Sequence, residues 1–127
     1  MTYRIALVGC GTVGIGFLKI LRDKGEHLMA RYGFEAKIVA VSDKVKGAVM
    51  ADEGIDLKAF VAHIESGKSI NDFSPKAIHG MDSVETIRKA KADMVVEVAW
   101  TDIKTGEPAT THIREAFKAG SHVITTN

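Results

Sequence analysis

The fold is decided by the stretch Tyr3-Arg4-Ile5-Ala6-Leu7-Val8-Gly9-Cys10-Gly11-Thr12-Val13-Gly14. Residues 3–8 form a short apolar run rich in β-branched side chains, which predicts a buried strand that ends at Gly9. The glycines that follow have the spacing G-x-G-x-x-G and lead into apolar positions at helical spacing from Val13 to about Ala30. The motif therefore stands in the strand-turn-helix context that gives it structural meaning.

The rest of the chain continues the alternation of short apolar runs with longer amphipathic ones. Further strands are expected at residues 36–42, 94–99 and 121–126, and further helices at residues 57–66, 82–91 and from Pro108 to Gly120. Residues 67–81 are broken by Pro75 and predict no more than a very short edge strand at 77–78. This order predicts an α/β fold with a doubly wound, mostly parallel sheet of the Rossmann type, formed by one domain over residues 1–127.

Composition excludes several classes of partner. The chain has 127 residues, with 17 Lys and Arg against 16 Asp and Glu, so its net charge is +1. This balance argues against a nucleic-acid partner, which usually requires a marked basic excess. No apolar run approaches the roughly 20 residues of a membrane helix, and no secretory signal is visible. The single cysteine fits a cytoplasmic protein.

The glycine motif predicts a binding site for the pyrophosphate of a dinucleotide. Gly9 permits a tight turn, Gly11 leaves room for phosphate against the backbone, and Gly14 lets the helix pack closely on the strand. The free N–H groups of the first helical turn and the helix dipole then attract the phosphates. A glycine-rich turn with no ligand is the alternative.

Asp43 comes at the end of the second strand, where a carboxylate can accept hydrogen bonds from an adenosine ribose. It can equally be a turn residue that caps the following backbone. The neighbouring Lys44 could neutralise a 2′-phosphate, whereas the carboxylate would repel one, so the choice between NAD and NADP stays open.

Other polar and aromatic residues have both structural and functional interpretations. Glu97 lies in an apolar strand and must be paired or protonated if buried, which favours a structural role. Trp100 and Thr101 follow that strand and border the expected crevice, although Trp100 also suits a core. Cys10 is expected to offer its backbone rather than a reactive thiol. The five histidines have no metal-ligand spacing, and no metal site or identifiable proton-transfer residue emerges.

Several stretches together resemble the NAD(P)-binding domain of homoserine dehydrogenase over essentially the whole chain. The N-terminal half contributes the motif at residues 5–14 and Val41-Ser42-Asp43. The C-terminal half contributes Asp93-Met94-Val95-Val96-Glu97-Val98, Lys104-Thr105-Gly106-Glu107-Pro108 and His122-Val123-Ile124-Thr125-Thr126-Asn127. The glycine motif is shared by many dehydrogenases, whereas the combination of the later stretches is much more specific.

The resemblance implies an oxidoreductase that interconverts L-homoserine and L-aspartate 4-semialdehyde with NAD or NADP, in threonine and methionine biosynthesis and as a homodimer. It also implies the roles of individual residues. The pyrophosphate would contact the amides around Cys10, Thr12 and Val13. The adenosine ribose would face Asp43 and Lys44. The nicotinamide would approach Ala99, Trp100 and Thr101, with Thr126 and Asn127 beside it and the substrate.

The chain also departs from the family pattern. Trp100 stands where the family usually has Ser or Thr followed by Pro, and the family motif continues past Asn127 into Lys and Gly. The family's catalytic Lys and acid and its substrate domain are absent, so we expect a fragment that binds the cofactor and turns nothing over. A non-catalytic module that senses NAD(H) is the alternative. A methyltransferase fits worse, because S-adenosylmethionine has no pyrophosphate.

Overall fold

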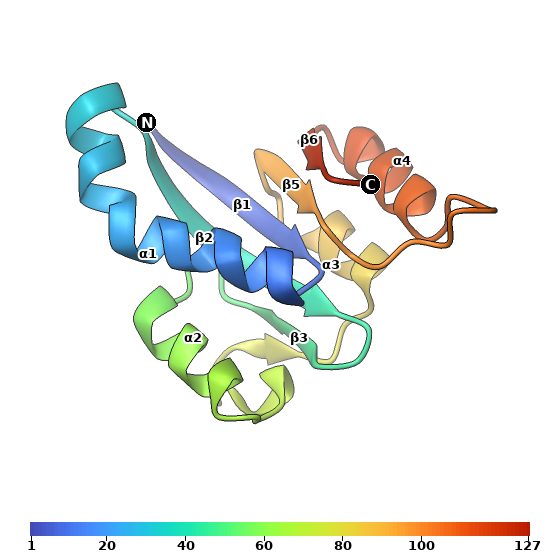
Figure 1. The fold of residues 1–127 in the computed structure, drawn as a ribbon, viewed down its shortest axis with the longest axis horizontal. Coiled ribbons are helices and arrows are strands. Elements are labelled where there is room, and N and C mark those ends of the chain that lie inside the picture. The colour runs from blue at the N-terminus through green and yellow to red at the C-terminus, as the bar shows by residue number, and fades with distance from the viewer.

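A computed structural model describes all residues, 1–127, as a single sheet with helices on both faces (Figure 1). The elements in chain order are β1 (Thr2–Val8), α1 (Thr12–Tyr32), β2 (Glu35–Asp43), β3 (Gly47–Met50), α2 (Leu57–Glu65), the 3-10 turn η1 (Ile70–Asp72), β4 (Ile78–His79), α3 (Ser83–Lys89), β5 (Met94–Glu97), α4 (Ala109–Lys118) and β6 (His122–Thr125). None of these helices has the length and apolar character needed to cross a membrane.

The sheet has six strands in the order β4-β3-β2-β1-β5-β6. Strand β1 pairs in parallel with both β2 and β5, and β5 pairs in parallel with β6. Strands β3 and β4 extend the β2 edge in antiparallel pairing. The chain therefore leaves β1 toward β2 on one side and returns to β5 on the other, and this reversal creates a crevice at the carboxyl ends of the strands. The expected doubly wound, mostly parallel fold is confirmed.

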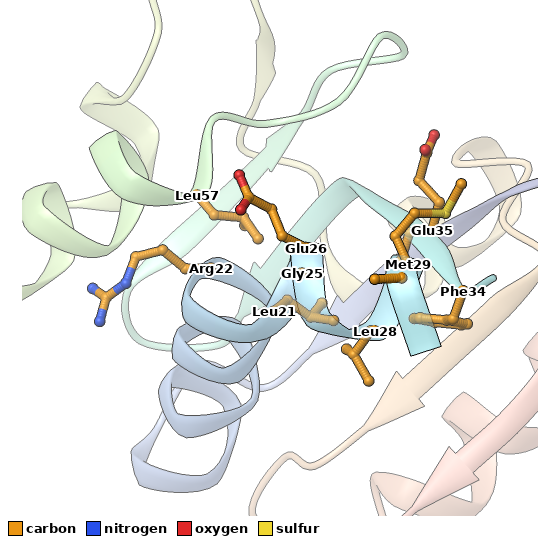
Figure 2. Close-up of a pocket in the computed structure, with 11 residues that line it drawn as sticks. Leu21, Arg22, Gly25, Glu26, Leu28, Met29, Phe34, Glu35 and Leu57 are labelled. Atoms are coloured by element: carbon orange, nitrogen blue, oxygen red, sulfur yellow. The ribbon is translucent and has the colours of Figure 1, made fainter. Parts of the chain in front are cut away.

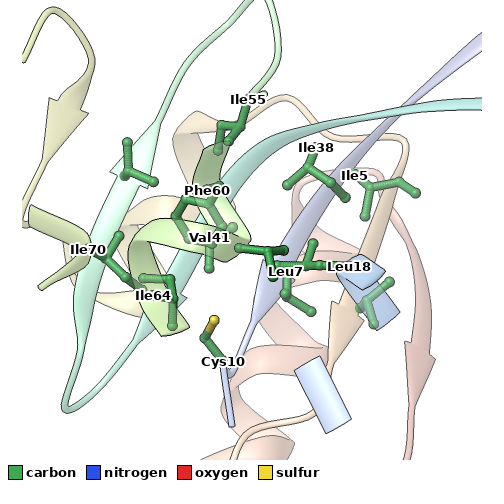
Figure 3. Packing of buried hydrophobic residues seen from close by; sticks show 13 residues of the cluster. Ile5, Leu7, Cys10, Leu18, Ile38, Val41, Ile55, Phe60, Ile64 and Ile70 are labelled. Carbon is green, nitrogen blue, oxygen red and sulfur yellow. The ribbon is translucent and has the colours of Figure 1, made fainter. Parts of the chain in front are cut away.

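Each face of the sheet has its own core. Figure 3 shows the larger one, in which Leu7 of β1 and Val41 of β2 pack with Leu18 of α1 and Phe60 of α2. On the opposite face, Val8 and its neighbours pack with Ile87 of α3 and Ala116 of α4. Burial on both faces explains why the central strands are continuous apolar runs.

A bulge in β2 lets two consecutive residues of this strand join the same core. Ile5 pairs with Ile38 but the next residue, Ala6, pairs with Ala40, so Val39 is an extra residue in its strand. Val39 and Ala40 consequently both belong to the core under α3 and α4, while Ile38 lies in the core under α1 and α2.

The structure corrects the sequence-based element bounds at several points. It adds β3, which no pattern had indicated, and it extends α1 to Tyr32. Strand β5 ends at Glu97 rather than Ala99, and the short edge strand is at Ile78–His79. Helix α4 begins at Ala109, so Pro108 lies one position before it. Strand β3 follows a turn that the Asp43 carboxylate closes by accepting the amides of Val45 and Lys46, and such a turn has no hydrophobic period.

The glycine at position 14 allows α1 to start directly against β1. A Cβ atom at Gly14, in the first turn of α1, would lie 2.3 Å from the carbonyl oxygen of Gly9. Gly16, two residues later in the same helix, has open space around its Cβ position. The helix therefore needs a glycine at position 14 for packing and has no such need at position 16.

We expect Gly14→Ala and Gly16→Ala to change stability in opposite directions. Gly14→Ala forces a side chain into backbone and should lower the free energy of unfolding by about 2 kcal/mol or more. Gly16→Ala, the matched control, should raise it by about 0.5–1 kcal/mol because alanine restricts the unfolded chain and favours helix. Urea denaturation of both variants measures the difference, and equal effects would contradict this account of the β1–α1 contact.

Candidate functional site

The glycine loop between β1 and α1 is held tightly at both ends and open in the middle. Gly9 has a φ of +101°, and a Cβ atom there would lie 2.5 Å from the backbone nitrogen of Ala99. Gly14 is closed off by Gly9, as described above. Gly11, by contrast, has nothing within 4 Å of its Cβ position. Of the three motif glycines, only Gly11 leaves backbone open to an approaching molecule.

The open part of the loop coincides with the start of α1. Gly11 is the N-cap of this helix, no side chain caps it, and no acidic residue lies in its first turn. The amides of Thr12 and Val13 have no hydrogen-bond partner within the chain. Both side chains are exposed. The expectation that Val13 belongs to the apolar face of the helix is therefore wrong. Unpaired amides at the positive end of a helix of 21 residues form a suitable site for an anion.

A crevice of about 1120 Å³ lies next to this loop, at the carboxyl ends of β1, β2 and β5. Its walls come from the glycine loop, the β2–β3 turn, the start of α3 and the segment from Val98 to His112. Residues expected at the site that line this crevice are Gly9, Gly11, Asp43, Lys44, Ala99 and Trp100. Its volume exceeds that of most small-ligand pockets, which suits an extended ligand.

The remaining residues expected at the site lie outside the walls of the crevice. These are Cys10, Thr12, Val13, Gly14, Thr101, Thr126 and Asn127. Cys10 and Gly14 are buried, whereas Thr12 and Val13 are exposed at the start of α1. Thr126 and Asn127 follow β6, and Asn127 reaches back to the β5 end.

Trp100 is 79% exposed, so its interpretation as a core residue is wrong. It lies on the crevice wall together with Asp102 and Thr105 of the same loop. That loop is closed by its own backbone, since the amide of Asp102 donates to the carbonyl of Glu107 and the amide of Gly106 donates to the carbonyl of Asp102, both at 2.8 Å. The indole is therefore presented to solvent beside the crevice by an ordered turn.

Asp43 and Lys46 hold the peptide units of Cys10 from the β2–β3 turn, and we call this pair the Cys10 clamp. The Cys10 amide donates to Oδ2 of Asp43 at 2.8 Å. The Lys46 ammonium donates to the Cys10 carbonyl at 2.6 Å. The other carboxylate oxygen, Oδ1, accepts the amides of Val45 and Lys46 at 2.9 Å each. The clamp therefore shapes the glycine loop and the hairpin turn together.

The clamp determines the electrostatics of Asp43 and Cys10. Burial alone would raise the pKa of the Asp43 carboxyl, but the amides of Lys46, Cys10 and Val45 and the Lys46 charge hold it below its usual 3.8. Burial raises the pKa of the Cys10 thiol to about 11, opposed by Lys46 and reinforced by Asp43. The carboxylate thus caps the turn, one of its two expected roles, and the Cys10 amide is already paired.

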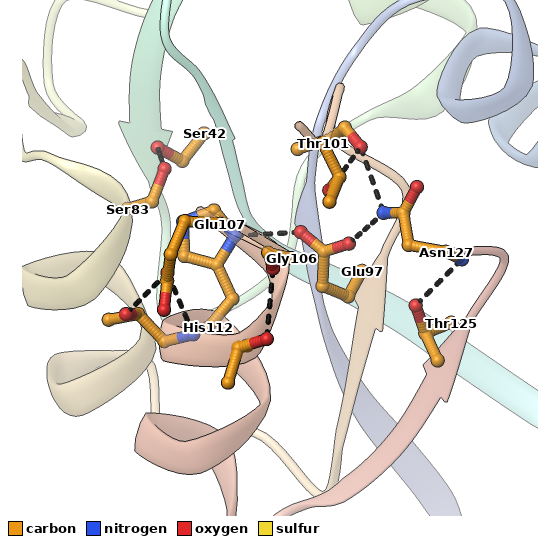
Figure 4. Close-up of polar contacts among 12 residues, drawn as sticks. Ser42, Ser83, Glu97, Thr101, Gly106, Glu107, His112, Thr125 and Asn127 are labelled. Carbon is orange, nitrogen blue, oxygen red and sulfur yellow. Dashed lines mark hydrogen bonds and ion pairs between the residues drawn. The ribbon is translucent and has the colours of Figure 1, made fainter. Parts of the chain in front are cut away.

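Glu97 ends β5 with its side chain fully buried, and it is paired as a buried carboxylate must be. Figure 4 shows it between His112 of α4 and Asn127. Sequence reasoning missed the pairing of Glu97 with His112, because the two residues are 15 positions apart and lie in different elements. A histidine close to the start of the helix that follows an acidic strand is the sequence signal that points to this pair.

A second hollow of about 550 Å³ lies at the far end of α1 (Figure 2). Leu21, Leu28 and Met29 of the helix line it together with Phe34 and with Leu57 of α2. It is remote from the carboxyl ends of the strands and includes none of the residues expected at the site.

We expect Asp43→Asn to destabilise the fold in a pH-dependent way. Because the folded-state pKa of Asp43 is lowered, its ionised form stabilises the fold above the unfolded value of about 3.9, and this contribution is lost as the pH falls through the folded-state value. The variant should lose about 1 kcal/mol at pH 7, since the site is partly exposed to solvent. The difference from the unaltered chain should narrow as the pH falls below about 5 and through the folded-state pKa.

Urea denaturation at several pH values measures this difference. Asp72→Asn, at an exposed acidic residue of η1, is the matched control and should change stability little at any pH. A penalty for Asp43→Asn that is constant with pH would show that the carboxylate charge does not hold the clamp.

Comparisons with known proteins identify relatives of this chain. Residues 2–121 match the family model of Glutamate/Leucine/Phenylalanine/Valine dehydrogenase. The chain is 41% identical over 124 residues to homoserine dehydrogenase of Methanocaldococcus jannaschii, covering 97% of this chain and 36% of that protein. It is 33% identical over 125 residues to the NAD(+)-dependent homoserine dehydrogenase of Pseudomonas canavaninivorans, covering 98% of this chain and 35% of that protein.

Solved structures show the same fold. The putative homoserine dehydrogenase of Archaeoglobus fulgidus superposes with a TM-score of 0.74 at 30% identity, covering 98% of this chain and 34% of that one. A hyperthermophilic archaeal homoserine dehydrogenase mutant in complex with NADPH gives 0.79 at 22% identity, covering 100% and 36%. The chain spans about a third of the length of the curated relatives it matches. These matches confirm the resemblance to homoserine dehydrogenase, and the chain belongs to the Glutamate/Leucine/Phenylalanine/Valine dehydrogenase family.

Proposed function

We propose that residues 1–127 are the NAD(P)-binding domain of a homoserine dehydrogenase and bind the dinucleotide in the crevice beside the glycine loop. The observation that carries this proposal is the pair of unpaired amides at Thr12 and Val13, reached across the open Gly11. The relative from Pseudomonas canavaninivorans is named as NAD(+)-dependent, and an archaeal relative of the same fold is described in complex with NADPH. Both names support a dinucleotide as the ligand.

In this proposal the chain's own residues bind and orient, and the bound dinucleotide supplies hydride transfer. The amides of Thr12 and Val13 hold the pyrophosphate, with Cys10 placed behind them by its clamp. Asp43 and Lys44 face the adenosine ribose. The nicotinamide half lies toward Ala99, Trp100 and Thr101, with Thr126 and Asn127 near it and the substrate.

The whole protein, in the same proposal, interconverts L-homoserine and L-aspartate 4-semialdehyde for threonine and methionine biosynthesis, as a cytoplasmic homodimer. These 127 residues alone contain no identified catalytic group, so we expect them to bind cofactor without turnover. The relatives named above are dehydrogenases, which favours this function over a nucleotide sensor or a methyltransferase.

We expect Gly11→Ser to strengthen the fold slightly and to weaken dinucleotide binding. Gly11 is an extended N-cap with open space around it, so a serine fits without strain and its hydroxyl can accept the free helix amides. Those amides are the ones proposed to bind phosphate, and the affinity should fall about tenfold, or roughly 1.4 kcal/mol. The single tryptophan, Trp100, lines the crevice and provides a fluorescence signal for titration with NAD and NADP.

Gly16→Ala is the matched control for this titration, because it stabilises α1 away from the loop and should leave the affinity unchanged. Unchanged affinity in Gly11→Ser would exclude the helix amides as the phosphate site. A homoserine-dependent reduction of NAD by the unaltered 127 residues would contradict the proposed division of function.

We expect Lys44→Ala to reduce affinity for NADP more than affinity for NAD. Lys44 is exposed on the crevice wall beside Asp43, and it is the cation proposed to meet a 2′-phosphate. The selective loss should be about two- to fivefold, as expected for an exposed ion pair. Lys24→Ala, at an exposed position of α1, is the control, and equal effects on both dinucleotides would rule out the phosphate contact.

A further inference from the structure

The strongest unassigned feature of the molecule is the polar network at the end of β5. Oε2 of Glu97 lies 2.7 Å from Nδ1 of His112, and Oε1 accepts a hydrogen bond from Nδ2 of Asn127. The same Asn127 amide donates to the carbonyl of Ala99 at 2.8 Å. Glu97 is fully buried, and Figure 4 shows it between its two partners.

His112 connects this network to the crevice. Its side chain is 7% exposed, and the residue lines the crevice. Only Nδ1 of the ring has a hydrogen-bond partner. No buried side-chain nitrogen or oxygen of the protein lacks a partner, so Nε2 is not sealed in the core. The unpaired nitrogen of a nearly buried ring is therefore accessible from the crevice.

The partners of Glu97 determine which ring nitrogen carries the proton. A carboxylate only accepts hydrogen bonds, so Nδ1 of His112 must donate to it. Asn127 cannot turn its amide oxygen toward Glu97 without losing its hydrogen bond to Ala99. When the imidazole is neutral, its proton is consequently held on Nδ1, and Nε2 is left as an acceptor at the crevice.

We propose that Nε2 of His112 is a ligand-binding acceptor of the crevice and that Glu97 is its positioning residue. The group it recognises is a hydrogen-bond donor of the bound dinucleotide, either a ribose hydroxyl or the carboxamide NH2. This inference rests on the proposed function. A buried Glu97 carboxylate needs hydrogen-bond donors, but it does not need one of them to be a histidine. The proposal therefore gives the Glu97–His112 pair a binding role beyond the pairing of a buried charge.

The tautomer is tested without ligand. Long-range ¹⁵N–¹H NMR of the ¹⁵N-labelled chain should show a protonated Nδ1 and an unprotonated Nε2 for His112. In Glu97→Gln, the new amide should donate to Nδ1 while its oxygen keeps the Asn127 contact, so the proton should move to Nε2. An imidazolium in the unaltered chain, or an Nε2–H tautomer, would overturn the assignment.

The binding role is tested by calorimetric titration with NAD and with ADP. We expect His112→Ala to weaken NAD binding about 3- to 10-fold, the usual effect of one hydrogen bond. Glu97→Gln should weaken NAD binding similarly, while residue 97 keeps its hydrogen bonds to His112 and Asn127. This second variant tests the proposal even if truncation of His112 disturbs folding. His27→Ala, at an exposed histidine of α1, is the matched control and should bind like the unaltered chain.

Each outcome of the titration has a defined meaning. A loss with NAD alone places the donor on the nicotinamide half, and an equal loss with ADP places it on the adenosine half; both support the inference. Normal affinity of folded His112→Ala and Glu97→Gln, with binding intact in the unaltered chain, would overturn it and leave the proposed function standing. Failure of the unaltered chain to bind either nucleotide would overturn both.

Discussion

The structure depends on one backbone contact, the placement of the first turn of α1 directly on the end of β1. At Gly14 the helix meets the carbonyl of Gly9 so closely that no Cβ fits, and Gly9 meets the β5 end at Ala99 in the same way. The end of β1, the start of α1 and the segment after β5 therefore meet through backbone atoms alone. Because the contact leaves no room for side chains, the helix start and its amides are fixed at the carboxyl edge of the sheet, where open α/β folds bind ligands.

The contact alone does not shape the loop, since a glycine-rich segment has many accessible conformations. The β2–β3 turn removes this freedom from outside, through the Asp43 carboxylate and the Lys46 ammonium on the peptides of Cys10. The same carboxylate closes its own hairpin turn. The antiparallel extension of the sheet is thus coupled to the candidate site, because the Asp43 carboxylate binds both the loop and the hairpin turn.

Hydrophobic periodicity in the sequence predicted the β1-loop-α1 unit and the helices near α2 and α3. The structure shows the cap of α3, in which the Asp82 carboxylate accepts the Glu85 amide at 2.8 Å. Periodicity did not predict β3, because Lys44, Val45 and Lys46 form an ordinary polar loop pattern and the turn is closed by Asp43. It also did not predict the exposure of Trp100 or the burial of His112. The burial of His112 depends on its hydrogen bond to a different element, and the exposure of Trp100 depends on a turn that is closed by its own backbone. Neither feature has a period along the chain.

The crevice and the glycine loop beside it therefore offer two chemically different kinds of group. At the start of α1 the chain offers unpaired donors, the amides of Thr12 and Val13, which favour negative charge. At the start of α4 it offers an acceptor, held by a buried carboxylate whose two oxygens are both occupied. A dinucleotide has matching groups, phosphates that accept and hydroxyl or amide groups that donate. Complementarity of both kinds within one crevice restricts the ligand more strongly than a glycine-rich turn does by itself.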